Sequence, residues 1–166
     1  MPDRARQIQY GLPPVITRDA KVLILGSFPS VRSLSAGQYY ANPRNVFWRI
    51  LGKITGTDPA LPYDERVRLL TSRHIALWDV IGSCRRTGSA DSRIGDAMKN
   101  DVAGLLASHP GIRLIACNGS TSARFLKGLS LPETITVIRL PSTSPANARL
   151  PFREKCRAWS VLTRYL

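Results

Sequence analysis

Short apolar runs alternate along the chain with segments whose apolar residues recur at helical spacing. A continuous aliphatic run that ends in a turn is typical of a buried strand. Four such runs predict strands at residues 22–26, 75–80, 112–117 and 134–140. Apolar positions three or four residues apart predict helices. These positions lie within residues 44–54, 64–72, 94–108, 121–129 and 151–166.

This order of elements predicts an α/β fold. Strands that alternate with helices usually form a parallel sheet with helices on both of its faces. We therefore expect a three-layer α/β/α sandwich with a four-stranded parallel sheet. At 166 residues the chain is long enough to bury a core, and we expect a single domain over residues 1–166.

The segments at the ends of the four predicted strands are polar or turn-forming. In chain order they read GSFPS, WDVIGS, CNGST and LPSTSPANA. In open α/β sheets, ligands bind beyond the carboxyl ends of the strands, near the point where the strand order reverses. The sequence therefore predicts a binding site built from these four segments.

The charge of the chain narrows the choice of ligand. The formal net charge is +13, and 19 of the 24 basic residues are arginine. Arginine suits bidentate contact with phosphate, so this excess indicates a polyanion such as nucleic acid. A generally basic proteome or a need for solubility would produce the same excess. Because the arginines are spread along the chain, folding would have to assemble any binding face.

The composition gives little support to membrane or metal-dependent functions. The longest apolar runs have about four residues, far fewer than the ~20 of a membrane span. The first residues contain no apolar signal region, and we expect a cytoplasmic protein without a membrane partner. The three cysteines, Cys84, Cys117 and Cys156, are far apart and only two histidines are present. We therefore expect neither a metal nor another cofactor.

The most unusual stretch, GSFPSVRSLSAGQYYANPRNVFW, begins at the end of the first predicted strand. Taken singly, its residues have ordinary interpretations. GSFP is not a phosphate loop, because no Lys-Ser pair follows at the required spacing, and it could be a simple turn. Asn42 and Asn45 could be turn or helix-cap residues. Tyr39 and Tyr40 are adjacent and cannot both face one core, so one of them is available for a ligand.

The conjunction of these features resembles a known family. G-x-x-P, a loop and aromatic-Ala-x-Pro-x-Asn-x-Phe-Trp resemble the first motif of the uracil-DNA glycosylase superfamily, and LPSTSPANA resembles its second motif. With LWDVIGSCRRTGSADSRI and CNGSTSARF, they are similar to the hypoxanthine-DNA glycosylase branch, over residues 22–148. The resemblance implies the superfamily's α/β/α fold and hydrolysis of the bond between a flipped base and its deoxyribose.

The chain departs from the common pattern of this superfamily at two positions. Phe28 stands where most branches carry the Asp or Asn that activates water, and Leu140 replaces the His of the second motif. The hypoxanthine branch also lacks the first carboxylate and is understood to use a later asparagine. The resemblance therefore implies that Asn45 positions the attacking water, with Asn42 as the second candidate.

The same resemblance implies a pocket for the flipped base. Tyr40 falls at the position of the stacking aromatic, with Tyr39 as the alternative. Asp79 could accept a hydrogen bond from N1–H of hypoxanthine, but it could equally cap or brace its loop. The remaining residues assigned to the base pocket are Gly26, Ser27, Phe28 and Asn118.

The second motif is expected to contact the DNA backbone. Ser142, Thr143 and Ser144 would hold phosphates through hydroxyl and N–H groups. The following residues, which include Asn147 and Arg149, could enter the gap left by the flipped nucleotide.

The resemblance, with these residues, implies a monofunctional glycosylase that removes hypoxanthine from double-stranded DNA, and we expect it to act as a monomer, in the cytoplasm and at the nucleoid. No lysine stands at a motif position of the four loops, which disfavours Schiff-base chemistry. Two alternatives remain open. One is a uracil- or mismatch-specific glycosylase, and the other is a catalytically silent nucleic-acid-binding module of the same fold.

Overall fold

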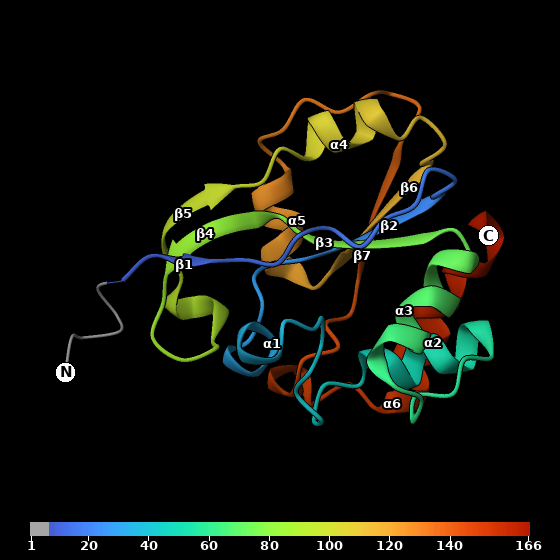
Figure 1. Ribbon diagram of the computed structural model, residues 1–166, viewed down its shortest axis with the longest axis horizontal. Helices are drawn as coiled ribbons and strands as arrows, with labels where there is room; N and C mark the ends of the chain where they lie inside the picture. Colours follow the sequence, from blue (N-terminus) through green and yellow to red (C-terminus); the bar gives the residue numbers. More distant parts are fainter. Residues whose placement is uncertain (1–6) are drawn as a thin grey trace.

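A four-stranded parallel sheet forms the centre of the computed structural model, which describes residues 7–166 (Figure 1). Its order is β3-β2-β6-β7. The strands are β2 (Val22–Gly26), β3 (Ile75–Asp79), β6 (Leu114–Asn118) and β7 (Thr136–Leu140). All three strand pairs are parallel. The four predicted strands are therefore confirmed, with bounds that differ by at most two residues.

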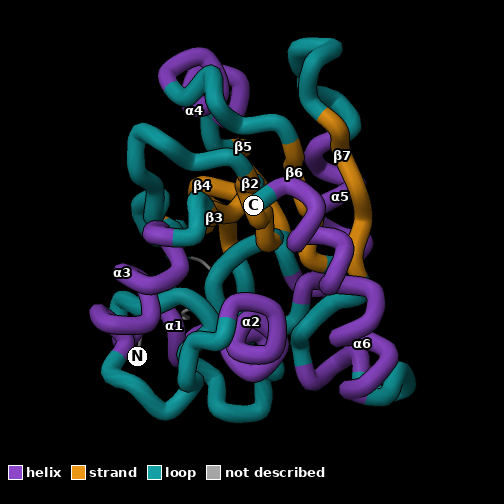
Figure 2. The backbone as a smooth tube through the Cα atoms, turned by 90° about the vertical axis from the view of Figure 1, so that its right-hand side faces the viewer, coloured by secondary structure: helices purple, strands orange, loops and turns teal. Residues whose placement is uncertain are grey.

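Helices cover both faces of this sheet. Figure 2 shows α2 (Phe47–Thr55), α3 (Tyr63–Ser72) and α6 (Phe152–Trp159) gathered on one side. They pack with strand residues such as Ile24, whereas α4 (Val102–Ser108) and α5 (Ser120–Leu126) pack with the opposite set, such as Leu25. Successive side chains of a strand point to opposite faces, so each strand contributes to both layers. The predicted three-layer α/β/α sandwich is confirmed.

A second, smaller sheet was not predicted from the sequence. It consists of β1 (Gln9–Tyr10), β4 (Ile81–Arg85) and β5 (Gly95–Lys99), all antiparallel, in the order β1-β4-β5. The prediction of one helix over residues 94–108 is wrong in its first half, where β5 pairs with β4. Helix α4 begins only after Asp101, whose side chain accepts a hydrogen bond from the Gly104 N–H and caps it.

Two further segments differ in detail from the sequence pattern. The loop after β2 contains the short helix α1 (Val31–Ala36), capped by the Ser30 side chain and ended by Gly37 in the left-handed region. The predicted closing helix at residues 151–166 consists of α6 followed by a 3-10 helix, Ser160–Tyr165.

The strand order reverses between β2 and β6. The chain passes from β2 to β3 on one side, and later to β6 on the other side of β2. The carboxyl ends at this point are Gly26 and Asn118. In such sheets this crevice is the expected ligand site, so the fold places two of the sequence-predicted residues there.

Some features are absent from the part of the chain that the structure describes. Residues 7–166 contain no helix long and apolar enough to cross a membrane. They also contain no group of three or more His, Cys, Asp or Glu side chains able to hold a metal ion. The three cysteines are unpaired thiols.

Phe47 joins the first motif to the helical layer, and its truncation should weaken the fold. Its ring is fully buried, stacks on Tyr40 at 3.9 Å between centroids and meets Trp159 edge-on at 6.1 Å. We expect Phe47→Ala to lower the free energy of unfolding by about 3–5 kcal/mol, measured by urea denaturation. The exposed Lys53 on the same helix is the control, since Lys53→Ala should change it by no more than about 0.5 kcal/mol. Equal stabilities for the two variants would contradict this role.

Candidate functional site

The ends of β2 and β3 bring a glycine against a carboxylate. Gly26 is paired with Asp79 in the register of the sheet. A side chain at Gly26 would collide with the Asp79 carboxylate, and its Cβ would also lie 3.1 Å from the Tyr40 hydroxyl. Only glycine leaves room for both groups at this point.

Asp79 is a buried carboxylate with an unused oxygen. Its side chain is 4% exposed, and Oδ2 has no hydrogen-bond partner among the described residues. Burial raises the pKa of Asp79 to about 7, and the nearby negative charge of Asp91 adds to this, while Arg86 opposes it. Oδ2 is enclosed, and the residue stands at the carboxyl end of β3. A carboxyl group in this position whose pKa lies near neutrality is a candidate for ligand recognition.

Asn118 connects the sheet to both motif loops. Its Nδ2 donates to the Tyr40 hydroxyl at 3.2 Å and to Thr143 Oγ1 at 2.9 Å, and its Oδ1 accepts from the Thr143 N–H at 3.0 Å. The two amide hydrogens are thereby engaged within the protein. The side chain of Thr143 is 1% exposed and lies against Asn118. The structure therefore places both residues as supports of the site rather than on its surface.

The two adjacent tyrosines point in different directions. Tyr39 is buried, and its hydroxyl donates to the Pro13 carbonyl at 2.9 Å. Tyr40 is partly buried, adopts φ +56° and packs one ring face against Phe47. A left-handed conformation is uncommon for a bulky residue and costs about 1–3 kcal/mol. In this conformation Tyr40 Oη reaches the end of the sheet, where it accepts a hydrogen bond from Asn118.

The two motif asparagines are both held in tight turns. Asn45 Oδ1 accepts from the Phe47 N–H at 3.0 Å, and Asn42 Oδ1 accepts from the Arg44 N–H at 3.0 Å. The next residue, Val46, donates its N–H to the Thr143 carbonyl at 3.1 Å, which ties the first motif to the second. An amide oxygen has two lone pairs, so a capping bond leaves one acceptor position on Asn45 for a water.

The GSFP turn is supported by residues that sequence reasoning missed. Ser27 donates to Asp91 Oδ1 at 2.8 Å. Phe28 is buried in a small apolar cluster, and the guanidinium of Arg86 lies 5.0 Å from the centre of its ring. Arg86 itself is 2% exposed and donates to the Pro29 carbonyl. Phe28 is thus part of a packed apolar cluster just beyond the end of β2, and no local pattern in the sequence indicated its arginine partner.

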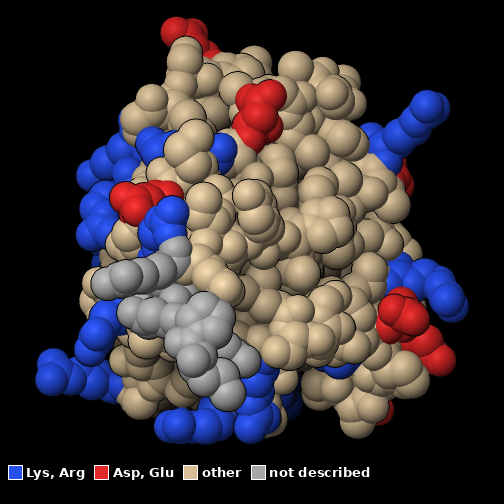
Figure 3. Space-filling model, turned by 60° about the vertical axis from the view of Figure 1, so that its left-hand side comes forward, with Lys and Arg blue, Asp and Glu red and all other residues tan. Residues whose placement is uncertain are grey.

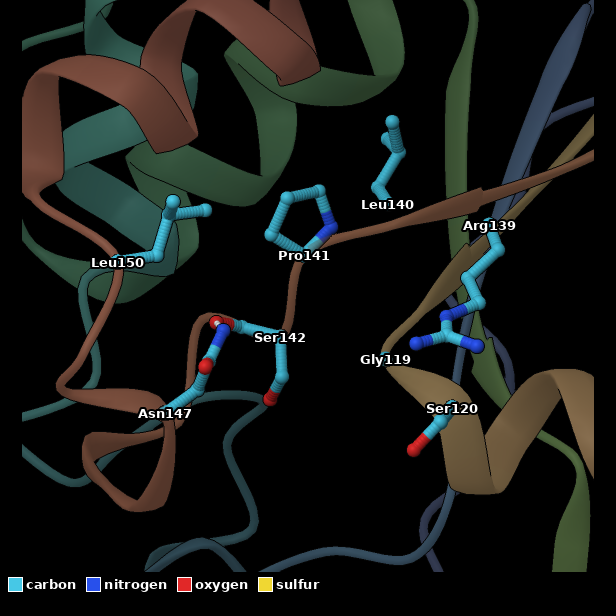
Figure 4. A pocket seen from close by; sticks show the side chains of 8 residues that line it. All are labelled: Gly119, Ser120, Arg139, Leu140, Pro141, Ser142, Asn147 and Leu150. Atoms are coloured by element: carbon cyan, nitrogen blue, oxygen red, sulfur yellow. Dashed lines mark hydrogen bonds between the residues drawn. The ribbon is translucent and has the colours of Figure 1, made fainter.

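A cavity of about 520 Å³ opens beside the second motif (Figure 4). Its residues come from the β6–α5 turn, from β7 and from the loop after β7. They are Gly119, Ser120, Arg139, Leu140, Pro141, Ser142, Asn147 and Leu150.

The predicted residues Ser142 and Asn147 lie together in this cavity, where Asn147 Nδ2 donates to the Ser142 carbonyl at 3.2 Å. Arg139 and Ser120 were not predicted and stand opposite them (Figure 4). Ser144 lies outside the cavity and caps the 3-10 helix Pro145–Asn147, and Arg149 is exposed nearby. The cavity thus combines one cation with hydroxyl and amide groups, a combination that suits phosphate.

Folding leaves the charges unevenly distributed over the surface. On the face drawn in Figure 3, Lys and Arg side chains stand along the left, lower and right margins, with fewer Asp and Glu side chains among them, around a centre that carries little charge. Such a field would attract a polyanion.

Comparison with known proteins places this architecture in a family. The model of the uracil DNA glycosylase superfamily matches residues 13–163. The chain belongs to this superfamily. A curated relative from Methanosarcina acetivorans, named hypoxanthine DNA glycosylase, is 36% identical and covers 95% of this chain and 99% of its own. A protein of the same name from Methanosarcina barkeri is 39% identical and covers 85% of this chain and 89% of its own.

The family resemblance extends to three dimensions. The solution NMR structure of a candidate uracil DNA glycosylase from Methanosarcina acetivorans superposes with a TM-score of 0.82. The two chains are 36% identical, and the match covers 95% of this chain and 98% of the other.

The burial of Asp79 predicts a specific pH dependence of stability. Its pKa is about 7 in the folded chain and about 3.8 in the absence of burial. Between these values the folded chain binds more protons than the unfolded chain, so this group lowers the free energy of unfolding as the pH rises. At about pH 8, Asp79→Asn should therefore be more stable than wild type by up to a few kcal/mol, since each pKa unit is worth about 1.4 kcal/mol.

The measurement is urea denaturation of both proteins between about pH 4 and 8. The difference between the two should grow with pH and level off above about pH 7. Asp96→Asn, at an exposed carboxylate, is the control and should show no such growth. A constant difference between wild type and Asp79→Asn would show that Asp79 has an ordinary pKa.

Proposed function

We propose that this protein is a monofunctional DNA glycosylase that hydrolyses the N-glycosidic bond of hypoxanthine in double-stranded DNA, a step of base-excision repair. The relatives named hypoxanthine DNA glycosylase support this assignment. The observation that carries it is the convergence of Tyr40, Asp79 and Asn118 at the carboxyl ends of the sheet. We also propose that the enzyme acts as a monomer.

The base pocket would lie against Gly26. We assign Tyr40 to stacking on the extruded base, a contact that recovers about 1–3 kcal/mol of the cost of flipping. The carboxylate of Asp79 would accept a hydrogen bond from N1–H of hypoxanthine, which adenine lacks. Phe28 would form an apolar wall, and Ser27 would hold the turn through Asp91.

The chemistry would depend on charge stabilisation and on an oriented water. Cleavage of an N-glycosidic bond develops positive charge on the sugar and negative charge on the departing base. The second acceptor position of Asn45 would orient the water and face the developing cation, with Asn42 as the alternative. Loss of one such contact typically costs about 10²–10³ in rate, so an amide can be useful without being a strong base.

The second motif would bind the damaged strand. Ser142, Asn147 and Arg139 line one cavity, and we assign them to a backbone phosphate. Ser144 and Arg149 would contact the DNA nearby. Thr143, predicted to hold phosphate, is buried on Asn118, and we assign it instead to positioning the loop.

One observation favours a second substrate. Uracil also presents an imide N–H, so the acceptor on Asp79 would suit it, and the NMR neighbour is described as a candidate uracil DNA glycosylase. Excision of uracil is therefore the alternative within the same chemistry.

Asn45→Ala should lower the single-turnover rate of base excision by roughly 10²-fold or more, the scale of one transition-state contact. The assay uses labelled duplexes with inosine, uracil or an undamaged base, cleaved with alkali after reaction. Asn45→Asp supplies a carboxylate of nearly the same volume and should retain activity. Asn42→Ala is the matched control and should be milder.

A role of Asn45 limited to capping α2 gives a different result. Loss of a cap lowers stability by about 1 kcal/mol and leaves the folded enzyme fully active. A wild type that releases no base from any of these duplexes would instead support a silent DNA-binding module.

Tyr40→Ala should reduce excision at subsaturating enzyme by roughly 5- to 150-fold, the range that corresponds to lost stacking of 1–3 kcal/mol. Tyr40→Phe keeps the ring and loses only the hydrogen bond to Asn118, so most of the activity should remain. Similar losses in both variants would assign the effect to the hydroxyl group rather than to stacking.

A further inference from the structure

A second hollow, of about 370 Å³, lies between the first motif and the second motif. Arg44 and Val46 form one wall, and the loop that contains Thr143 and Ser144 forms the other. The remaining lining residues are Pro145, Ala148, Leu150, Phe152 and Lys155. The walls are mainly apolar, with Arg44 and Lys155 as two cations and no acidic residue in the lining.

Lys155 is unusual because it is buried without an opposite charge. Its side chain is 4% exposed on α6. Within residues 7–166 the ion pairs join other side chains, and Lys155 makes no hydrogen bond through its ammonium group. Burial also lowers the pKa of Lys155. The stem of Lys155 is buried, but Nζ is not among the enclosed side-chain atoms of the described residues, so the ammonium keeps access to solvent. Arg44 adds a second positive charge to the same hollow, and an anion bound there would interact with both groups.

We propose that this hollow binds a phosphate of the DNA backbone, held between Lys155 and Arg44. The inference rests on the proposed function only in that DNA is the ligand. Arginine supplies a bidentate contact, the lysine a point charge and the Ser144 hydroxyl a further donor. The apolar wall around Phe152 suits the carbon face of the adjoining deoxyribose.

The position of the hollow gives this phosphate a role beyond affinity. Arg44 is adjacent to Asn45, and the hydrogen bond from Val46 N–H to the Thr143 carbonyl joins the two walls. A phosphate clamped here would therefore fix the Asn45 segment relative to the second motif. Lys155 is a binding and positioning residue in this arrangement. The hollow shares Leu150 with the cavity around Arg139 but is otherwise lined by different residues.

The first test measures the binding of an undamaged duplex by fluorescence anisotropy at several salt concentrations. Lys155→Met keeps the length of the side chain and removes one phosphate contact. The slope of log K against log[salt] should fall by about 1, with affinity lower by ~10-fold at low salt. Lys155→Arg should retain the wild-type slope. Arg157→Met removes an exposed charge from the same helix outside the hollow and should leave the slope unchanged.

The second test identifies the phosphate directly. Single neutral methylphosphonates are placed in turn along the strand that contains inosine. Wild type should lose affinity at one position where Lys155→Met is insensitive to the substitution. The melting temperature of free Lys155→Met should stay close to that of wild type, because Met keeps the buried apolar stem, and this measurement shows that the variant is folded.

Several results would overturn the proposal. One is an unchanged slope of log K against log[salt] in folded Lys155→Met, and another is an equal fall of this slope in Arg157→Met. A third is a methylphosphonate series in which wild type and Lys155→Met differ at no position. Borohydride trapping of a covalent adduct through Lys155 would also do so, since it would make the lysine a nucleophile. Both tests measure DNA binding and not base excision, so these outcomes are independent of whether hypoxanthine is removed.

Discussion

The candidate site depends on one amide side chain. Asn118 ends a central strand and hydrogen-bonds Tyr40, 78 residues before it, and Thr143, 25 residues after it. Because both hydrogens of the amide are used, the two motif loops have one arrangement in which it is satisfied. The bond from Val46 to Thr143 closes the same assembly from its other side. The geometry of the site is thus fixed by the buried amide of Asn118.

Around this support, the protein retains features that lower its stability. Asp79 is buried with an unused oxygen, Tyr40 adopts a left-handed backbone, and Lys155 is buried without a carboxylate. Departures of the same kind occur elsewhere in residues 7–166, since His74 and Asp96 also adopt left-handed backbones and Arg86 Nε is also buried without a hydrogen-bond partner. Tyr40 and Asp79, however, meet at Gly26, at the end of the central sheet. A strained backbone beside an unsatisfied carboxylate is typical of a functional site.

The sequence predicted the parts of the structure that depend on local pattern. The four central strands are short aliphatic runs, and the helices that cover them have apolar stripes, so their existence followed from periodicity. The β1-β4-β5 sheet did not follow, because Gly95–Lys99 is mostly exposed and is a strand only through its pairing with β4. The loops of the site were predicted as segments. The burial of Thr143 and Lys155 and the arginine partner of Phe28 could not be predicted, because they arise from contacts between distant residues.

The same contacts explain how the superfamily's chemistry can persist in this chain without a carboxylate in the first motif. Phe28 occupies that position and packs beside Arg86, so the position is a wall and has no group that could move a proton. The carboxylate of this site stands one strand away, on Asp79, and its burial makes the protonated and ionised forms comparable in energy near neutrality. In the proposed enzyme, recognition of the base and positioning of the water would be carried out by two residues, although a single acid could otherwise do both. Asp79 would face the base, and Asn45, held by the start of α2, would face the water and the sugar. A weak water-orienting group would then be sufficient if the contacts to the base and the backbone strengthen in the transition state.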